Sequence, residues 1–168
     1  GDVGAWNRFD QSRVNILQRM VDKIWETDSD AYIILEHLAD EPEEIALSEY
    51  RTNEGKDGMF LWGKMNREYN QLSMGFFNSD DFANSIDRAW FGNTNFNVPN
   101  QITYMESHDE QWLMYRNLAF GNSSNPDHNV KELDVALDRQ KIAGAFFLTI
   151  PGPKMLWQFG ELGYGFGD

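Results

Sequence analysis

The chain has 168 residues, of which 41% are hydrophobic, and its 27 acidic and 14 basic residues give a formal net charge of −13. The apolar content is that of a globular domain or part of one and excludes a disordered chain. The acidic balance argues against a nucleic acid or an anionic membrane as partner. The chain has no Cys, which excludes a disulfide or thiolate metal site, and its longest apolar run, residues 143–150, is too short to span a bilayer.

Short apolar runs alternate with amphipathic segments along the chain. Asp10 or Ser12 can cap the first helix, and the run AYIIL after it has no polar face, which predicts a strand buried on both sides. In chain order we expect helices at residues 12–27, 42–50, 66–77, 80–91, 110–118 and 131–148, and strands at residues 31–35, 59–62, 102–105 and 155–159.

This alternation indicates βαβ units and a parallel sheet. No glycine-rich phosphate loop follows any of the strands, which argues against a dinucleotide-binding fold. In a (β/α)8 barrel, functional side chains stand at the C-terminal ends of the strands. Glu36 and Asp109 occupy such positions. We therefore predict the α/β class and a partial (β/α)8 TIM barrel, with residues 1–168 forming a single piece of it.

Carboxylates at the tips of different barrel strands can converge on one substrate. Cleavage of a glycosidic bond needs a protonated acid for the leaving oxygen and an anion for the oxocarbenium-like transition state. From position alone, Glu36 could equally be a structural carboxylate, and the pair His108-Asp109 could be a turn with a satisfied His. His37, His108 and nearby carboxylates have no metal-ligand spacing such as HExxH, so we expect no metal site.

Three segments in order resemble the α-amylase family of retaining glycoside hydrolases. YIILEHLAD is similar to the fifth-strand motif, which ends in the general acid/base Glu, and ITYMESHDE is similar to the seventh-strand motif, which ends in His-Asp. LTIPGPKMLWQFGELG is similar to the eighth-strand region. The resemblance implies strands five to eight of the barrel, in a bacterial protein that acts on starch- or glycogen-type glucans.

Carried over by residue, the resemblance implies that Glu36 is the acid/base and that Asp109 stabilises the transition state. It implies that His108 hydrogen-bonds the sugar hydroxyls and that Glu161 is more structural than catalytic. Glu106 and Glu110 match no catalytic position, and we interpret both as supporting or solvent groups. The alternatives are a transglycosidase of the branching-enzyme type, which uses the same carboxylates, and a non-catalytic glucan-binding relative.

The family's nucleophile belongs to a fourth-strand motif ending in Arg-x-Asp. NRFDQ contains this pattern at Arg8 and Asp10, but no apolar strand precedes it, and Asp10 is placed to cap a helix. We expect the true motif to lie upstream, because the chain reads as if it begins inside a longer protein, without an initiator Met or a signal peptide. The isolated chain is then expected to be inactive and to self-associate through exposed barrel edges as a homo-oligomer.

The remaining expectations concern ligands and compartment. The partner is an α-glucan, no cofactor is expected in this chain, and calcium is possible in the longer parent. Trp62, Trp90 and Trp112 could stack on sugar rings, whereas Trp157 is expected in the core. The sequence does not establish the compartment, and a periplasmic or secreted location is favoured over a cytoplasmic one.

Overall fold

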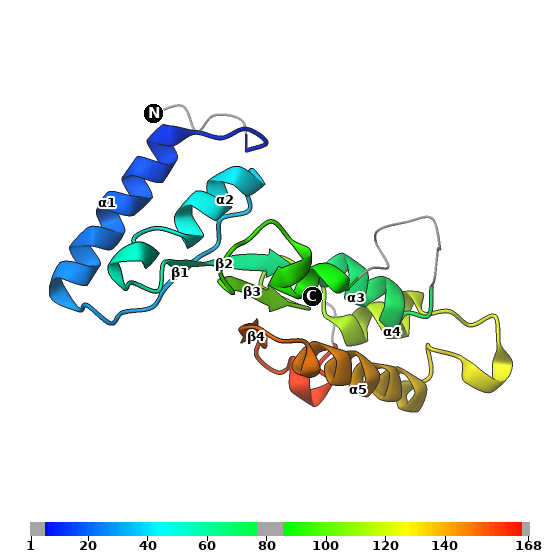
Figure 1. Cartoon of the computed structure of the whole chain (residues 1–168). Helices are drawn as coiled ribbons and strands as arrows, with labels where there is room; N and C mark the ends of the chain where they lie inside the picture. The colour runs from blue at the N-terminus through cyan, green and yellow to red at the C-terminus, as the bar shows by residue number, and fades with distance from the viewer. Residues whose placement is uncertain (1–5, 77–85, 166–168) are drawn as a thin grey trace. The chain divides into compact units, whose positions relative to one another are not determined.

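The computed structural model describes residues 6–76 and 86–165. It is an α/β structure with a four-stranded sheet in the order β1-β2-β3-β4, which is also the order along the chain. The strands are β1 (Ile33–Leu35), β2 (Met59–Lys64), β3 (Gln101–Tyr104) and β4 (Lys154–Met155). The helices are α1 (Gln11–Thr27), α2 (Glu41–Ser48), α3 (Asn66–Ser73), α4 (Leu113–Phe120) and α5 (Leu133–Thr149) (Figure 1).

The strands run parallel. The β1 and β2 registers pair Ile33 with Met59, and the β3 and β4 registers pair Thr103 with Lys154. Between β2 and β3, Leu61 N donates to Asn100 O at 2.8 Å and Met65 N donates to Tyr104 O at 3.1 Å. Both bonds join residues 39 positions apart, and this constant separation is the signature of parallel pairing. The predicted parallel sheet is therefore confirmed.

By its internal contacts the chain divides into two compact units. The first comprises residues 1–62 and 91–102, and the second comprises residues 63–90 and 103–168. Each unit has its own buried apolar cluster. Val14, Val21, Ile33, Leu47, Met59 and Leu61 belong to the first cluster. Met65, Tyr69, Met105, Leu113 and Phe147 belong to the second.

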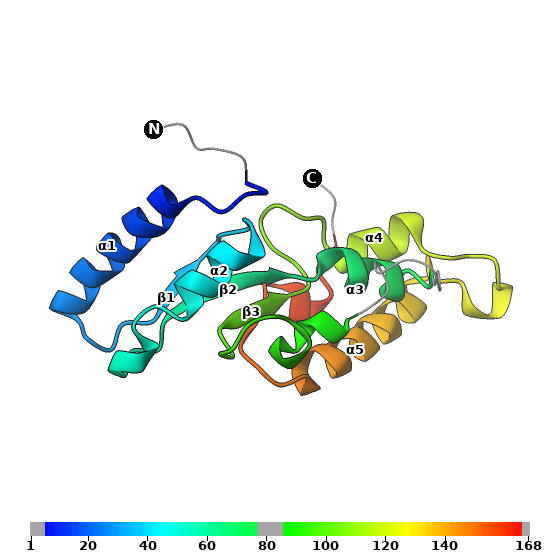
Figure 2. The same cartoon turned by 45° about the horizontal axis from the view of Figure 1, so that its top comes forward.

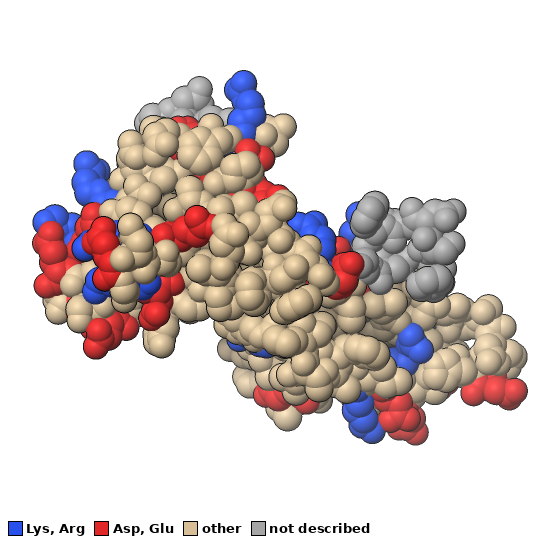
Figure 3. Space-filling model, viewed as in Figure 1, with Lys and Arg blue, Asp and Glu red and all other residues tan. Residues whose placement is uncertain are grey.

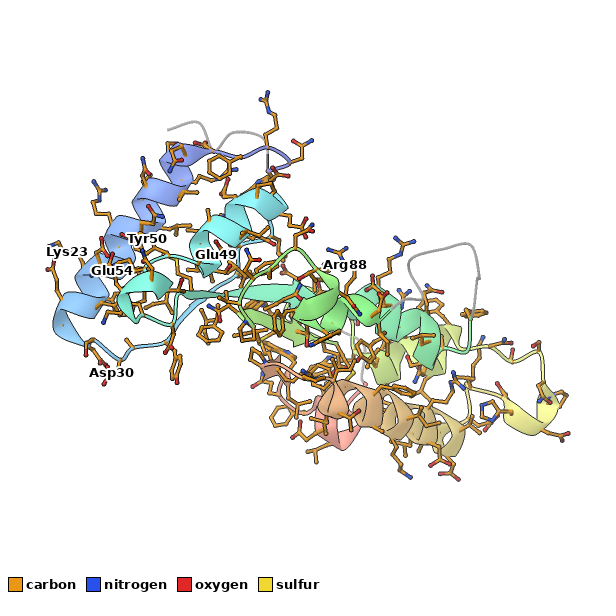
Figure 4. The ribbon with its side chains drawn as sticks, viewed as in Figure 1. Lys23, Asp30, Glu49, Tyr50, Glu54 and Arg88 are labelled. Atoms are coloured by element: carbon orange, nitrogen blue, oxygen red, sulfur yellow. The ribbon has the colours of Figure 1, made fainter. Side chains whose placement is uncertain are left out.

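In the first unit, α1 and α2 pack against each other (Figure 1). Helix α1 begins beside Asp10, as predicted, because the Asp10 side chain accepts a hydrogen bond from Ser12 N. Lys/Arg and Asp/Glu side chains are interspersed over this unit (Figure 3). Tyr50 and Glu54 lie beside α1 (Figure 4). The Tyr50 hydroxyl donates to Asp22 at 2.9 Å, and Arg51 forms ion pairs with Asp22 and Glu54.

The prediction that the AYIIL strand is buried on both faces is wrong. Ile33 is buried in the first cluster, but Ile34 is 55% exposed and Tyr32 is 69% exposed. On the more open face, the Tyr32 ring meets the Phe60 ring edge-on at 5.6 Å. An apolar run therefore does not by itself distinguish a strand covered on both faces from one covered on a single face.

The entrance to β2 depends on a glycine and a buried amide. Gly58 has φ +74°, and a Cβ built there would lie 1.9 Å from Ser48 O, so only glycine fits. Asn100 is buried, and its Nδ2 donates to Ser48 O and Asp57 O at 3.1 and 2.5 Å. This amide ties the end of α2, the start of β2 and the start of β3 together within the first unit.

In the second unit, α3, α4 and α5 pack as one group (Figure 2). The predicted helix at residues 80–91 falls partly on residues 77–85, which lie outside the described residues; its described part forms a 3-10 turn, Asp87–Ala89. The predicted last strand is shorter than expected and ends at Met155; further on, Phe159 adopts φ +67° and leads into the 3-10 turn Gly160–Leu162. None of the helices within residues 6–76 and 86–165 is both long and apolar enough to cross a membrane.

Candidate functional site

Glu36 directly follows β1 in the first unit, and its side chain is exposed. The next residue, His37, is only 7% exposed. The chain therefore turns consecutive ionisable side chains in opposite directions, Glu36 toward solvent and His37 into the protein. Such a position at the C-terminal end of a parallel strand is where the sequence predicted a functional carboxylate.

The position of His37 is set by a buried carboxylate, Glu43, whose side chain is fully buried. Glu43 accepts hydrogen bonds from Arg13 Nε and Nη2, both at 2.9 Å, and from Asp10 N at 2.9 Å. Its Oε1 also lies 2.7 Å from His37 Nε2. Burial alone would raise the pKa of Glu43, but the hydrogen bonds from Arg13, Asp10 N and His37 outweigh it and lower the pKa below its ordinary value. An ionised carboxylate only accepts, so His37 carries its proton on Nε2.

Asp10 acts as a helix cap in this network. Its Oδ1 accepts from Ser12 N at 2.8 Å and from Ser12 Oγ at 2.6 Å, and these bonds lower its pKa. Arg13, one turn into α1, lies 3.8 Å from the other carboxylate oxygen. The predicted capping role of Asp10 is confirmed, and both of its polar groups are engaged in fixing the start of α1.

An exposed tryptophan lies beside His37 in the first unit. The Trp6 ring is 54% exposed and meets the His37 ring edge-on at 6.3 Å, and the Arg13 guanidinium lies 5.3 Å from the centre of the same ring. A guanidinium over the ring face holds the indole by a cation–π contact. An aromatic surface therefore stands close to the residue that follows Glu36.

In the second unit, a buried carboxyl group, that of Glu106, lies two residues after the end of β3. Glu106 is 3% exposed, and its Oε1 accepts from Leu113 N at 2.6 Å. Its Oε2 packs so closely on Gly160 that a Cβ there would lie 2.1 Å away. Burial raises the pKa of Glu106 to about 7, with a smaller contribution from the charge of Glu161, although the Leu113 hydrogen bond opposes it. The alternative that Glu106 faces solvent is therefore wrong, and its supporting role stays a prediction.

The loop between β3 and α4 is braced by polar contacts. Ser107 Oγ donates to Glu110, and Asp109 N donates to Ser107 Oγ at 3.3 Å. Glu110 also forms an ion pair with Lys64, at the end of β2. The carboxylate of Glu106 closes the loop by binding the first amide of α4. These contacts hold the backbone on both sides of His108 in one arrangement.

His108 and Asp109 project from this braced loop. Their side chains are 49% and 65% exposed, and His108 Nε2 lies 3.5 Å from Asp109 Oδ1. The His108 ring is tilted against the Trp157 ring at 5.8 Å between centroids. Trp157 is half-buried rather than part of the core as predicted, because the chain leaves β4 at Met155 and turns. An acceptor, a titratable ring and an indole therefore lie side by side.

The other aromatic candidates differ in environment. Trp62 and Trp112 are half-buried, and Trp90 is 42% exposed. The Trp112 ring meets the Tyr164 ring edge-on at 5.0 Å. Glu161 is exposed on the 3-10 turn after β4.

The structure thus brings His108 and Asp109 together in the second unit and places Glu36 at the end of β1 in the first. Sequence reasoning missed the buried role of Glu43, since it interpreted this residue only as a favourable charge in the first turn of a helix. For Glu106 the sequence contained no signal of burial, because strand alternation puts it on the same face as His108, whereas β3 ends at Tyr104 and the structure buries Glu106 and exposes His108.

Comparison of the sequence with protein-family models and with curated proteins finds no match to either.

Proposed function

We propose that this chain is part of a retaining glycoside hydrolase that acts on α-glucosidic bonds of starch- or glycogen-type glucans, on a (β/α)8 barrel. The observation that carries the proposal is the placement of the candidate groups. Glu36 and the pair His108-Asp109 each follow a parallel strand at its C-terminal end and each is exposed to solvent. In a barrel of parallel strands such positions face one substrate site.

In this proposal each group has a separate task. Glu36 protonates the leaving oxygen of the glycosidic bond. The bond breaks as a nucleophilic Asp, which is neither Asp10 nor Asp109, attacks the anomeric carbon. Glu36 next removes a proton from the water that releases the sugar. Asp109 and His108 hydrogen-bond the ring hydroxyls, and Trp157 offers an indole beside them. Asp10 is not assigned as the nucleophile, because its carboxylate caps α1.

The proposal is tested with maltooligosaccharides in the longer protein to which the chain would belong. Glu36→Gln should lower turnover about 10²- to 10⁴-fold, the range supplied by a general acid, without loss of folding. Glu41→Gln, which changes an acidic side chain on α2 in the same unit, serves as the control. Full activity of Glu36→Gln would remove Glu36 from the mechanism.

The isolated 168-residue chain offers a second test. Without the nucleophile no covalent intermediate forms, so we expect no turnover of maltooligosaccharides. Turnover that disappears in Asp10→Asn would instead assign the nucleophile to Asp10. The homo-oligomer predicted from exposed barrel edges is checked by sedimentation of the same chain, and a stable monomer would contradict it.

A further inference from the structure

The second unit has a hollow of about 240 Å³ between the end of α3, the α4–α5 connection and α5. Its polar lining consists of Asn122, Ser124, Asn125 and His128 from the connection and Arg139 from α5. Among the described residues no carboxylate lines it, although the chain has a net charge of −13. Arg139, which is always charged, therefore makes the hollow positive. None of Glu36, His108 and Asp109 lines it.

The Arg139 guanidinium is held in place by the end of α3. Its Nε donates to Ser73 O at 2.5 Å and its Nη2 donates to Leu72 O. These carbonyls orient the guanidinium without neutralising its charge. Gly75 lies beside it, since a Cβ built at this glycine would stand 3.9 Å from Arg139 Cζ. Because Gly75 has no side chain and itself lines the hollow, the space next to the guanidinium belongs to the hollow.

The third guanidinium nitrogen, Arg139 Nη1, can be reached from solvent. It lies 3.5 Å from Nε2 of His128, an exposed residue on the 3-10 turn Pro126–His128, and this contact is itself exposed. An ordinary hydrogen bond from an N–H group is about 2.7–3.2 Å long, so this one is weak. Arginine only donates, so the imidazole accepts here. A neutral imidazole carries its proton on either nitrogen, so with an anion present His128 can instead donate from Nε2.

We infer that this hollow binds a phosphate-type oxyanion, with oxygens that accept from Arg139 Nη1 and His128 Nε2. Hydrogen bonds from a guanidinium to phosphate are about twice as strong as neutral ones, so the anion replaces the weak contact between the two side chains. The exposed Ser124 hydroxyl can donate to a further oxygen. Asn125 Oδ1 accepts from Asp127 N at 3.0 Å, which leaves Asn125 Nδ2 as another donor. The inference goes beyond the proposed hydrolase and does not depend on it.

The inference is tested on the ¹⁵N-labelled 168-residue chain by NMR titration with sodium phosphate, with sodium chloride at equal ionic strength as the reference. Phosphate should shift the ring signals of His128 in a saturable manner. Arg139→Gln removes the charged donor and should weaken phosphate binding about tenfold, and His128→Ala should weaken it several-fold. Arg19→Gln, the same change at an exposed position on α1, is the matched control and should bind phosphate as the wild type does.

His128→Ala covers the case in which Arg139→Gln fails to fold, because His128 is exposed and its loss leaves the bonds from Arg139 to α3 intact. A parallel titration with glycerol phosphate distinguishes the source of the group: tighter binding than inorganic phosphate would identify a phosphate monoester, and weaker binding would identify the free ion. Three results would overturn the inference: shifts that sodium chloride reproduces, equal phosphate affinity in the wild type and His128→Ala, or tighter binding of acetate than of phosphate.

Discussion

Glu106 makes the stability of the chain depend on pH in a direction that can be tested. Its pKa rises from an ordinary 4.5 to about 7, chiefly because the side chain is 3% exposed. A carboxyl group whose folded-state pKa exceeds its unfolded value destabilises the folded state when it is ionised. The cost is absent below about pH 4.5, grows through the interval up to about pH 7 and is complete above it. One pKa unit corresponds to about 1.4 kcal/mol, so the full cost is about 3 kcal/mol.

The perturbation is Glu106→Gln, which keeps an oxygen for Leu113 N but cannot ionise. Its amide nitrogen faces the Gly160 side, where an unpaired donor costs about 1–3 kcal/mol at every pH. That cost cancels when the difference in unfolding free energy between variant and wild type is compared at pH 8 and at pH 5. Because part of the cost is already present at pH 5, we expect this difference to be about 2.5 kcal/mol more favourable to the variant at pH 8.

The assay is urea denaturation followed by tryptophan fluorescence at both pH values. Glu161→Gln is an informative companion, because it removes the charge that adds to the raised pKa and should reduce the pH dependence without abolishing it. Glu26→Gln, which changes an exposed side chain on α1, should leave the pH dependence unchanged. An equal difference between Glu106→Gln and wild type at pH 5 and pH 8 would refute the reasoning.

Three further predictions concern backbone and buried charge. Gly160→Ala should destabilise the chain by several kcal/mol in thermal denaturation, because its Cβ would lie 2.1 Å from a carboxylate oxygen of the buried Glu106. In Gly144→Ala, within α5, the Cβ would meet nothing within 4 Å, and the variant should be more stable by about 0.5–1 kcal/mol. Equal effects of the two substitutions would contradict this. Glu43→Gln should cost about 3 kcal/mol in urea unfolding, because it removes the charge of the buried carboxylate that accepts two hydrogen bonds from Arg13. A neutral effect would show that the network carries little stability. Asp10→Ala should cost about 1 kcal/mol, and Asp10→Asn much less, because Asn also caps a helix; equal losses would argue against capping.

The elements followed from local pattern more closely than the site did. The first helix was predicted at residues 12–27 and is found at Gln11–Thr27, because its cap and its apolar spacing lie within the segment itself. The last strand was predicted at residues 155–159 and covers only Lys154–Met155, because an apolar run does not show how far a strand pairs with its neighbour in the sheet. Glu36 and His108 follow their strands as predicted, because chain order alone fixes which residues follow a strand. Their exposure was decided by the fold, since His37 and Glu106 follow the same strands and are buried.

The sequence by itself determined the alternation of strands and helices, the parallel sheet and the ionisable residues at the strand ends, since these depend on periodicity and chain order. Only the tertiary structure decided which carboxylates are buried. Glu43 is held by partners 30 and 33 residues away, and Glu106 lies against Gly160. Burial and pKa depend on neighbours that the fold brings from distant positions, and no local pattern contains them.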